Sequence, residues 1–244
     1  MKKTFIILIS SFLAACNTSN SNNNDNQLIV PHTKNPSQMS DAQLKNYKGK
    51  VQIACSRMCP KVEFVNNEWE VKEIAPEAFI DSFSENGRCL KTLTIDDYHT
   101  ANEKIASVII YDEQANRFNF VVANKPIGYN TDTFISANTR KTTWQWHVRG
   151  FNSIQINYDS FSNNLNTHYT TTINYIDGKL DDSSVSISTI KRDTTFEENY
   201  DKGKYEQSLQ VILQRDSIGN PVMILNKTKT GRNMITLCTY TYYK

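Results

Sequence analysis

From residue 50 to the C-terminus, hydrophobic and polar residues alternate along the chain with a period of two. The alternation recurs in runs that are rich in β-branched and aromatic residues, and polar clusters separate one run from the next. Such alternation is typical of strands with one packed face and one solvated face. The clearest runs are "EWEVKEI", "RCLKTLTID", "KIASVIIYD", "KTTWQWHVR", "NSIQINYD" and "SLQVILQRD". The pattern predicts an all-β chain, with a helical turn as an alternative only within residues 194–206.

The connectors between these runs mostly combine an acidic residue or Asn with Gly or a second Asn, as hairpin turns require. Gly150, Gly178, Gly203 and Gly231 follow one another at intervals of 28, 25 and 28 residues, which indicates a repeated two-strand unit. We therefore expect a long antiparallel meander. Because open twisted sheets rarely exceed about ten strands, the meander should form a sandwich-like or partly closed barrel. An extended single-layer sheet is the alternative.

The N-terminal part of the chain follows a different pattern. Residues 1–15 combine two lysines, an apolar run and small residues, as a secretory signal peptide does. Residues 16–39 are predicted to be a flexible tether, since their first half is rich in Asn and almost free of apolar residues. Ser40 and Gln43 have the spacing of a capping box, which predicts a short helix from about residue 41 to 47. Residues 40–244 are then a single β-rich domain.

The end of the signal peptide, "LAAC" (13–16), resembles the lipobox of bacterial lipoproteins. The resemblance implies cleavage before Cys16, a diacylglycerol on its thiol and an acyl chain such as palmitate on its amine. Several acyl chains anchor a protein stably to a membrane. An ordinary secretory signal with a chance cysteine is the alternative. The lipobox resemblance implies a bacterial cell envelope, and a resemblance to repeats of Gram-negative lipoproteins, described next, implies a Gram-negative one. By resemblance to enteric lipoproteins, Asn17 favours the outer over the inner membrane, with the periplasmic and external faces both open.

Two connectors and the strands that follow them resemble a known repeat. They are "FSENGRCLKTLTID" (83–96) and "RDSIGNPVMILN" (215–226), and they look like the YD/RHS-type repeat, Tyr/Phe-Asp-x-x-Gly-Asn before an apolar strand. Similar repeats occur in exported lipoproteins without an assigned activity, where they form β-meanders. The resemblance extends loosely over residues 50–244. Arg215 stands where Tyr is usual, and Ala115 replaces Gly. It implies an architecture and no catalytic residues.

The charge balance excludes some classes of function. Without residues 1–15, the chain carries 25 basic and 25 acidic side chains. Nucleic-acid binding needs a basic patch, so we expect no nucleic-acid partner and no electrostatic attraction to anionic lipid. The chain also lacks the nucleophile-elbow, zinc-protease, phosphate-loop and dinucleotide motifs. We therefore expect a protein that is not an enzyme and has no cofactor.

The cysteines and the acidic turns are the candidate bonding and metal sites. An oxidising compartment would allow disulfides, with three pairings open, among Cys55, Cys59, Cys89 and Cys238. No histidine stands at ligand spacing from them, and we expect no metal site. Five turn carboxylates stand singly rather than at calcium-loop spacing, so turn formation explains them: Asp112, Asp159, Asp177, Asp201 and Asp216.

Aromatic residues supply the candidate ligand sites. Trp144 and Trp146 are two residues apart and share one face of a predicted strand, opposite His147. Exposed, they would form a stacking platform for a sugar ring or a lipid; buried, they would be core. Tyr240 and Tyr242 share one face of a final strand, which at a sheet edge could receive a partner. Cross-strand packing is the alternative for these tyrosines.

These observations lead to three functional hypotheses. The first is a non-enzymatic, lipid-anchored envelope protein that binds an unidentified envelope protein or other ligand through its sheet. The second is a surface lipoprotein that binds or processes a glycan through Trp144 and Trp146. The third is a structural component of the envelope.

Overall fold

The protein is described by a computed structural model that covers residues 36–148, 150–162, 165–228 and 231–244. The predicted signal peptide, Cys16 and residues 17–35 of the predicted tether lie outside the described residues. Within those ranges, no helix combines the length and the hydrophobicity that crossing a membrane would need.

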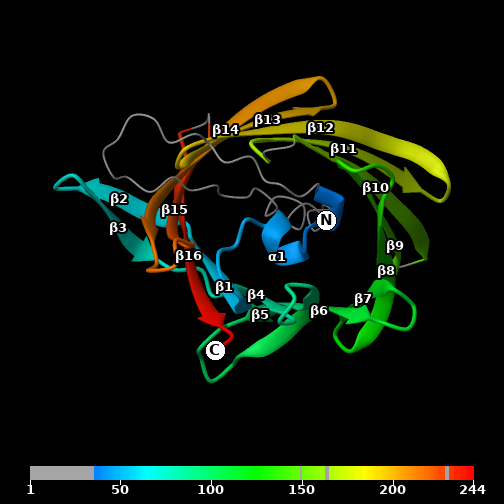
Figure 1. The fold of residues 1–244 in the computed structure, drawn as a ribbon, viewed down its shortest axis with the longest axis horizontal. Helices are drawn as coiled ribbons and strands as arrows, with labels where there is room; N and C mark the ends of the chain where they lie inside the picture. Colours follow the sequence, from blue (N-terminus) through cyan, green and yellow to red (C-terminus); the bar gives the residue numbers. More distant parts are fainter. Residues whose placement is uncertain (1–35, 149, 163–164, 229–230) are drawn as a thin grey trace.

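Fourteen strands form one closed antiparallel barrel, shown in Figure 1. Each strand pairs with its neighbours along the chain, the last strand pairs with the first, and the hairpin β2–β3 is inserted between β1 and β4. The strands are β1 (Val51–Cys59), β2 (Lys61–Val65), β3 (Glu68–Glu73), β4 (Ala78–Phe83), β5 (Cys89–Asp96), β6 (Lys104–Asp112), β7 (Arg117–Val122), β8 (Lys125–Phe134), β9 (Thr139–Val148), β10 (Phe151–Phe161), β11 (Thr167–Ile176), β12 (Lys179–Lys191), β13 (Thr194–Asp201), β14 (Lys204–Arg215), β15 (Pro221–Thr228) and β16 (Asn233–Tyr242).

The predicted meander and its two-strand repeat are confirmed. Gly150, Gly178, Gly203 and Gly231 all have positive φ and all lie between strands at the same end of the barrel. The sheet closes completely, beyond the partial closure that the sequence predicted. Closure gives β16 a partner on each side, β1 and β15, so Tyr240 and Tyr242 do not lie at a sheet edge, and the cross-strand packing considered for them agrees with the structure. Residues 194–206 form strand rather than helix.

The strand register assigns each side chain to the inside or the outside of the barrel, because residues directly opposite one another share a face. On β12, Ser184, Ser186 and Ser188 lie on one face and Val185 and Ile187 on the other. Following the pairs round the barrel places the serines on the same face as Phe118 and Phe83, which pack against residues in the barrel interior. This part of the barrel is therefore polar inside and apolar outside.

A short N-terminal segment, residues 36–50, enters the barrel and is called the entry segment. It contains the 3-10 turn η1 (Pro36–Gln38) and the helix α1 (Asp41–Leu44), which lies within the ring of strands in Figure 1. The predicted capping box is confirmed: the Ser40 hydroxyl accepts from the Gln43 N–H, and the Gln43 side chain accepts from the Ser40 N–H. The helix is shorter than predicted, ending at Leu44.

The interior core lies where the entry segment meets the first strands. Phe83 is 1% exposed and packs with Val51, Ala54 and Cys89, while Tyr47 of the entry segment meets the Phe83 ring edge-on at 5.7 Å. Polar contacts fix the same segment: Lys45 Nζ lies 2.6 Å from Asp81, and the Cys89 N–H donates to Asp41. Gly87 allows the close approach, since a Cβ there would lie 2.5 Å from the Ser40 hydroxyl.

A second apolar cluster lies on the outside of the barrel. Cys59, Leu225 and Ile235 are almost fully buried there, and Val62, Trp69 and Val71 of the β2–β3 hairpin pack against them. The hairpin therefore covers the outer face of β1, β15 and β16. This cover explains why Cys59, although it points away from the barrel interior, is 0% exposed.

Candidate ligand site in the barrel interior

Trp144 and Trp146 share one face of β9, as the sequence predicted, and that face is the interior of the barrel. The register pairs Trp144 with Asn130 of β8, which in turn pairs with Phe118 of β7. Phe118 packs against the buried interior core. His147 lies on the outer face and is exposed, with Nδ1 2.8 Å from Asn152 Oδ1.

The two indoles meet edge to face, with ring centroids 6.5 Å apart and planes at 68°. Both side chains are half-buried, so each keeps surface that a ligand could cover. Gly128 of β8 makes room for them, because a Cβ at this position would lie 2.2 Å from the Gln145 carbonyl oxygen and 2.7 Å from Trp146 Cβ. The site thus needs glycine here for space.

Buried polar atoms beside the tryptophans have no hydrogen-bond partner in the described part of the chain. They are Asn130 Oδ1, Asp132 Oδ1 and Arg140 Nε, and their side chains share the interior face of β8 and β9 with the tryptophans. A buried polar atom without a partner costs free energy comparable to a lost hydrogen bond. Burial raises the pKa of Asp132, which the nearby Arg140 charge partly opposes. Unpaired acceptors and a donor beside two half-buried indoles are what a polar ligand with a flat apolar face would satisfy.

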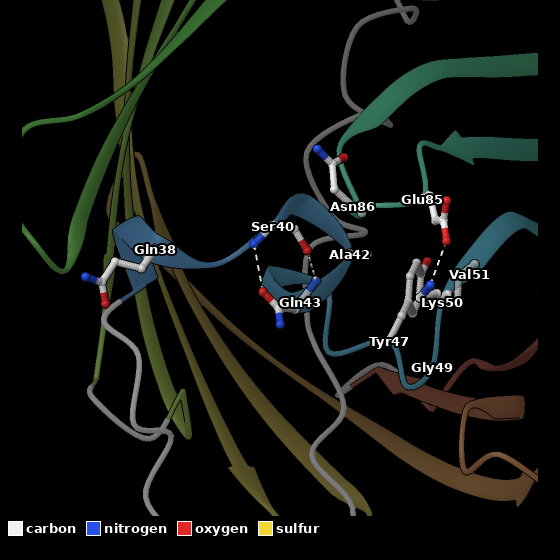
Figure 2. A pocket seen from close by; sticks show the side chains of 11 residues that line it. Gln38, Ser40, Ala42, Gln43, Tyr47, Gly49, Lys50, Val51, Glu85 and Asn86 are labelled. Atoms are coloured by element: carbon white, nitrogen blue, oxygen red, sulfur yellow. Dashed lines mark hydrogen bonds and ion pairs between the residues drawn. The ribbon is translucent and has the colours of Figure 1, made fainter. Parts of the chain in front are cut away.

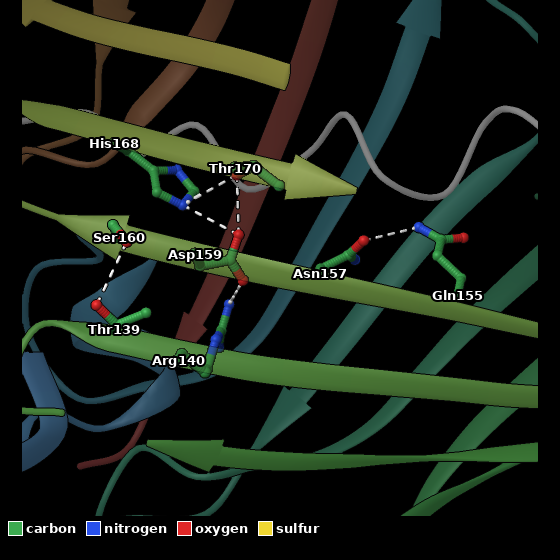
Figure 3. Close-up of polar contacts among 8 residues, drawn as sticks. All are labelled: Thr139, Arg140, Gln155, Asn157, Asp159, Ser160, His168 and Thr170. Carbon is green, nitrogen blue, oxygen red and sulfur yellow. Dashed lines mark hydrogen bonds and ion pairs between the residues drawn. The ribbon is translucent and has the colours of Figure 1, made fainter. Parts of the chain in front are cut away.

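A charged network continues from this site along the interior, as Figure 3 shows. Arg140 Nη2 lies 3.2 Å from Asp159 Oδ2, and both side chains are at most 10% exposed. The Thr170 hydroxyl donates to Asp159 at 2.8 Å, and His168 Nε2 lies 3.2 Å from the same carboxylate. Burial raises the pKa of Asp159, but His168 and Arg140 more than offset this and hold it below its ordinary value. Asp159 was predicted to be a turn residue; that is wrong, since it lies within β10 and is buried.

The Thr170, His168 and Asp159 side chains do not have the geometry of a nucleophile relay. In such a relay, one imidazole nitrogen faces the hydroxyl and the other faces the carboxylate. Here the same atom, His168 Nε2, lies 3.2 Å from both Thr170 Oγ1 and Asp159 Oδ1. The His168 ring instead stacks on Phe161, with centroids 4.5 Å apart and planes 2° from parallel. The arrangement fixes the ring and screens the buried carboxylate.

Glu197 extends the polar interior onto β13. Its carboxylate accepts from the Ser208 hydroxyl at 2.9 Å. Burial raises the pKa of Glu197, and the hydrogen bond from Ser208 partly opposes the shift. No group of three or more His, Cys, Asp or Glu residues is placed to hold a metal ion in the ranges that the structure describes.

The cysteines form no disulfide among the described residues. Cys55 and Cys59 lie on the same strand, four residues apart and extended, at roughly 13 Å. Cys55 pairs with Thr239 and therefore points away from the face of Cys238. Cys89 is separated from Cys238 by two intervening strands, roughly 14 Å across the sheet. Distance in two of these pairs, and opposite faces in the pair of Cys55 and Cys238, prevent a disulfide. Burial raises the pKa of the Cys89 thiol to about 11, so this thiol stays protonated at neutral pH.

The D-x-x-G-N turn, residues 216–220, is a clamp on the entry segment. Asn220 is 0% exposed; its side chain accepts from the Lys48 N–H and donates to the Lys48 carbonyl and the Tyr242 hydroxyl. Asp216 accepts three backbone N–H bonds within the turn and one from Tyr242. Burial raises the pKa of Asp216, but these donors hold it below its ordinary value. The turn is therefore structural, and Pro221 is the first residue of β15.

A hollow of about 310 Å³ lies between the entry segment and the loop at residues 85–87, as Figure 2 shows. Its polar groups are already engaged with one another, through the Ser40–Gln43 capping box and the 2.6 Å ion pair of Lys50 and Glu85. It offers little to hold a ligand, whereas the interior around Trp144 has unpaired polar atoms.

Sequence reasoning found the tryptophans and missed their polar surroundings. The polar residues come from three strands, and only the register brings them to the same interior face: Asn130 and Asp132 on β8, Arg140 on β9 and Asp159 on β10. Asn130 and Asp132 are two residues apart on β8, and Arg140, Thr142 and Trp144 follow one another at intervals of two on β9. This spacing is the signal that could have placed the polar residues on the same face as the tryptophans. No protein-family model, no curated protein and no solved structure matches the chain.

Proposed function

We propose that the protein is a non-enzymatic envelope lipoprotein whose barrel interior binds a polyhydroxylated ligand, an oligosaccharide. The observation that carries the proposal is the position of Trp144 and Trp146 on a polar interior face, beside the unpaired atoms of Asn130, Asp132 and Arg140. This supports glycan binding over an edge-strand partner site, because β16 has no open edge.

The chemistry of the site suits a sugar. A pyranose ring has one face of C–H groups that packs on an indole, and its rim of hydroxyls donates and accepts hydrogen bonds. The oxygens of Asn130 and Asp132 would accept from hydroxyls, and Arg140 Nε would donate to one. Each bond would satisfy a buried atom that has no other partner in the described chain, so binding would recover the cost of leaving it unpaired.

Tryptophan fluorescence provides the test. The chain has three tryptophans, and a Trp69→Phe background removes the signal of the β2–β3 hairpin. We expect titration with soluble peptidoglycan fragments or chitooligosaccharides to change the emission of Trp144 and Trp146. In calorimetry, Trp144→Ala and Asn130→Ala should each weaken binding by roughly tenfold.

The matched control is His147→Ala, on the same strand and the opposite face. It should leave affinity unchanged, because His147 points outside the barrel. Equal losses in His147→Ala and Trp144→Ala, or no binding of either class of oligosaccharide, would contradict the proposal. Product analysis of the bound oligosaccharide tests the non-enzymatic part, since new reducing ends would contradict it.

The lipid anchor is a separate part of the proposal and has its own test. We expect metabolic labelling with a palmitate analogue to label the wild type, and Cys16→Ser to abolish the label. An unlabelled wild-type protein would contradict anchoring without affecting the proposal for the barrel interior. Fractionation of the envelope would then test the expected preference for the outer membrane.

A further inference from the structure

The outer face of β10, β11 and β12 is an apolar surface, which we call the outer wall. Its centre combines aliphatic and small hydroxyl side chains: Ile156 pairs with Ile173, and on the next strand Val185 pairs with Thr171 and Ile187 with Tyr169. Val185 points outward and is 38% exposed, whereas its neighbours along the strand, Ser184 and Ser186, face the interior. This order, polar inside and apolar outside, is that of a sheet whose outer face meets lipid rather than water.

Tyrosines border this centre on both sides. Tyr158 and Tyr169 lie toward the end of the barrel where β10 ends and β11 begins, and Tyr175 lies toward the other end. Tyr169 is 48% exposed. Tyrosine is enriched at the membrane–water interface, where the ring meets apolar chains and the hydroxyl meets water. This centre with its tyrosine border therefore fits a membrane interface better than it fits solvent.

Charge distinguishes the outer wall from the rest of the outer surface. On β10 and β11 the outward side chains are all uncharged, and the exposed charges of β12, Lys179, Asp181 and Lys191, stand near its two ends. Elsewhere, charged residues such as Arg57 and Lys91 point outward, while Lys141 stands at the border of the wall, with its Nζ 5.9 Å from the centre of the Tyr158 ring. No described element covers the outer wall, whereas the β2–β3 hairpin covers the outside of β1, β15 and β16. The wall is one-sided, which suits contact with a surface.

The strands of the outer wall are long. β10, β11 and β12 have 11, 10 and 13 residues. At roughly 3.3 Å per residue, strands of this length give the wall room for a central patch between two tyrosine borders. Away from the wall, β4 and β7 have only 6 residues each.

We propose that the outer wall lies against the lipid bilayer, with its centre among the acyl chains and its tyrosines at the headgroups. The contact is independent of the oligosaccharide proposal, because it uses the opposite face of the strands. It is also independent of the lipid anchor, and the test therefore uses the chain from residue 17 onward, which lacks both the apolar signal peptide and Cys16.

Flotation with vesicles of phosphatidylethanolamine and phosphatidylglycerol measures the contact. We expect the chain from residue 17 onward to float with the vesicles, and the addition of Val185→Asp to lower the bound fraction by roughly tenfold. The matched control is Ile110→Asp, since Ile110 is 43% exposed and points outward on β6, away from the wall. It should float as the parent does. Thermal melting and oligosaccharide titration of both variants check that they are folded.

A second measurement does not depend on a destabilising charge. Val185→Trp and Ser186→Trp place an indole on opposite faces of adjacent positions. Vesicles of brominated phospholipid should quench the added fluorescence of Val185→Trp and not that of Ser186→Trp. Absence of flotation, equal loss in Ile110→Asp, or equal quenching at both positions would overturn the proposal. So would a concentration-dependent dimer that Val185→Asp dissociates and that does not bind vesicles, because it would assign the wall to a second copy.

Discussion

The barrel interior has two regions that are built on opposite principles. Around β1, β4 and β16, aromatic side chains pack on the entry segment, and Phe83 is 1% exposed. From β8 to β13 the interior is lined by amides, hydroxyls and charges. The first region gains stability by burying apolar surface. The second keeps buried polar groups whose bonds are incomplete, such as Asn130 and Arg140, and these are the atoms that the proposed ligand would satisfy.

The largest effect should come from the packed region. Phe83→Ala removes the ring that meets Tyr47 edge-on and leaves a cavity where the entry segment docks. We expect the free energy of unfolding in urea to fall by about 4 kcal/mol. Phe196→Ala is the control, because Phe196 is 44% exposed on the outside of β13; it should cost less than about 1 kcal/mol. Similar losses in both variants would mean that the entry segment adds no core.

The next largest loss of stability should come from the Arg140–Asp159 ion pair in the polar region. Asp159→Asn keeps the shape of the side chain but leaves the Arg140 charge buried without its partner. We expect a loss of about 3 kcal/mol in urea unfolding. The double variant Arg140→Met with Asp159→Leu removes both charges and should recover most of the loss. If the single and the double variant were equally unstable, the loss in Asp159→Asn would not come from leaving the Arg140 charge unpaired.

A smaller effect should come from the clamp that joins the end of the barrel to the entry segment. Asn220→Ala leaves the Lys48 backbone and the Tyr242 hydroxyl without their buried partner. We expect a loss of about 2 kcal/mol, together with faster hydrogen exchange at the Lys48 amide. Asn102→Ala is the matched control, since Asn102 is an exposed loop residue, and it should change neither quantity.

The smallest effect should be a gain in stability. Burial raises the pKa of Glu197, so its charged form destabilises the native state at neutral pH. The native state binds the Glu197 proton more tightly than the unfolded chain does. The stability that this protonated carboxyl contributes is therefore present below about pH 4 and is lost as the pH rises through the raised pKa. Glu197→Gln should raise the unfolding free energy by about 1 kcal/mol at neutral pH. The difference between variant and wild type should shrink toward pH 4; a difference independent of pH would contradict the assignment.

The sequence predicted the strands, the turns and the capping box because each of these depends on neighbouring residues. Gly150 and Gly178 mark turns through their own φ, and Ser40 and Gln43 cap a helix through their own spacing. Whether Trp144 faces inward depends on closure between β1 and β16, strands that are far apart in the sequence. The partners of Asp159 likewise come from β9 and β11. Period two shows that two faces exist, but it does not show which face is inside.

β12 presents its serines to the barrel interior and its aliphatic residues to the outside, where we propose that lipid contacts them. A spin label carried by an unnatural amino acid, introduced singly at positions 184 to 188 in vesicle-bound protein, tests this directly. Power saturation should show high oxygen accessibility at Val185 and Ile187, and high accessibility to a water-soluble nickel complex at Ser184, Ser186 and Ser188. The opposite alternation, or equal accessibility at all five positions, would contradict the assigned faces of β12 and the proposed lipid contact.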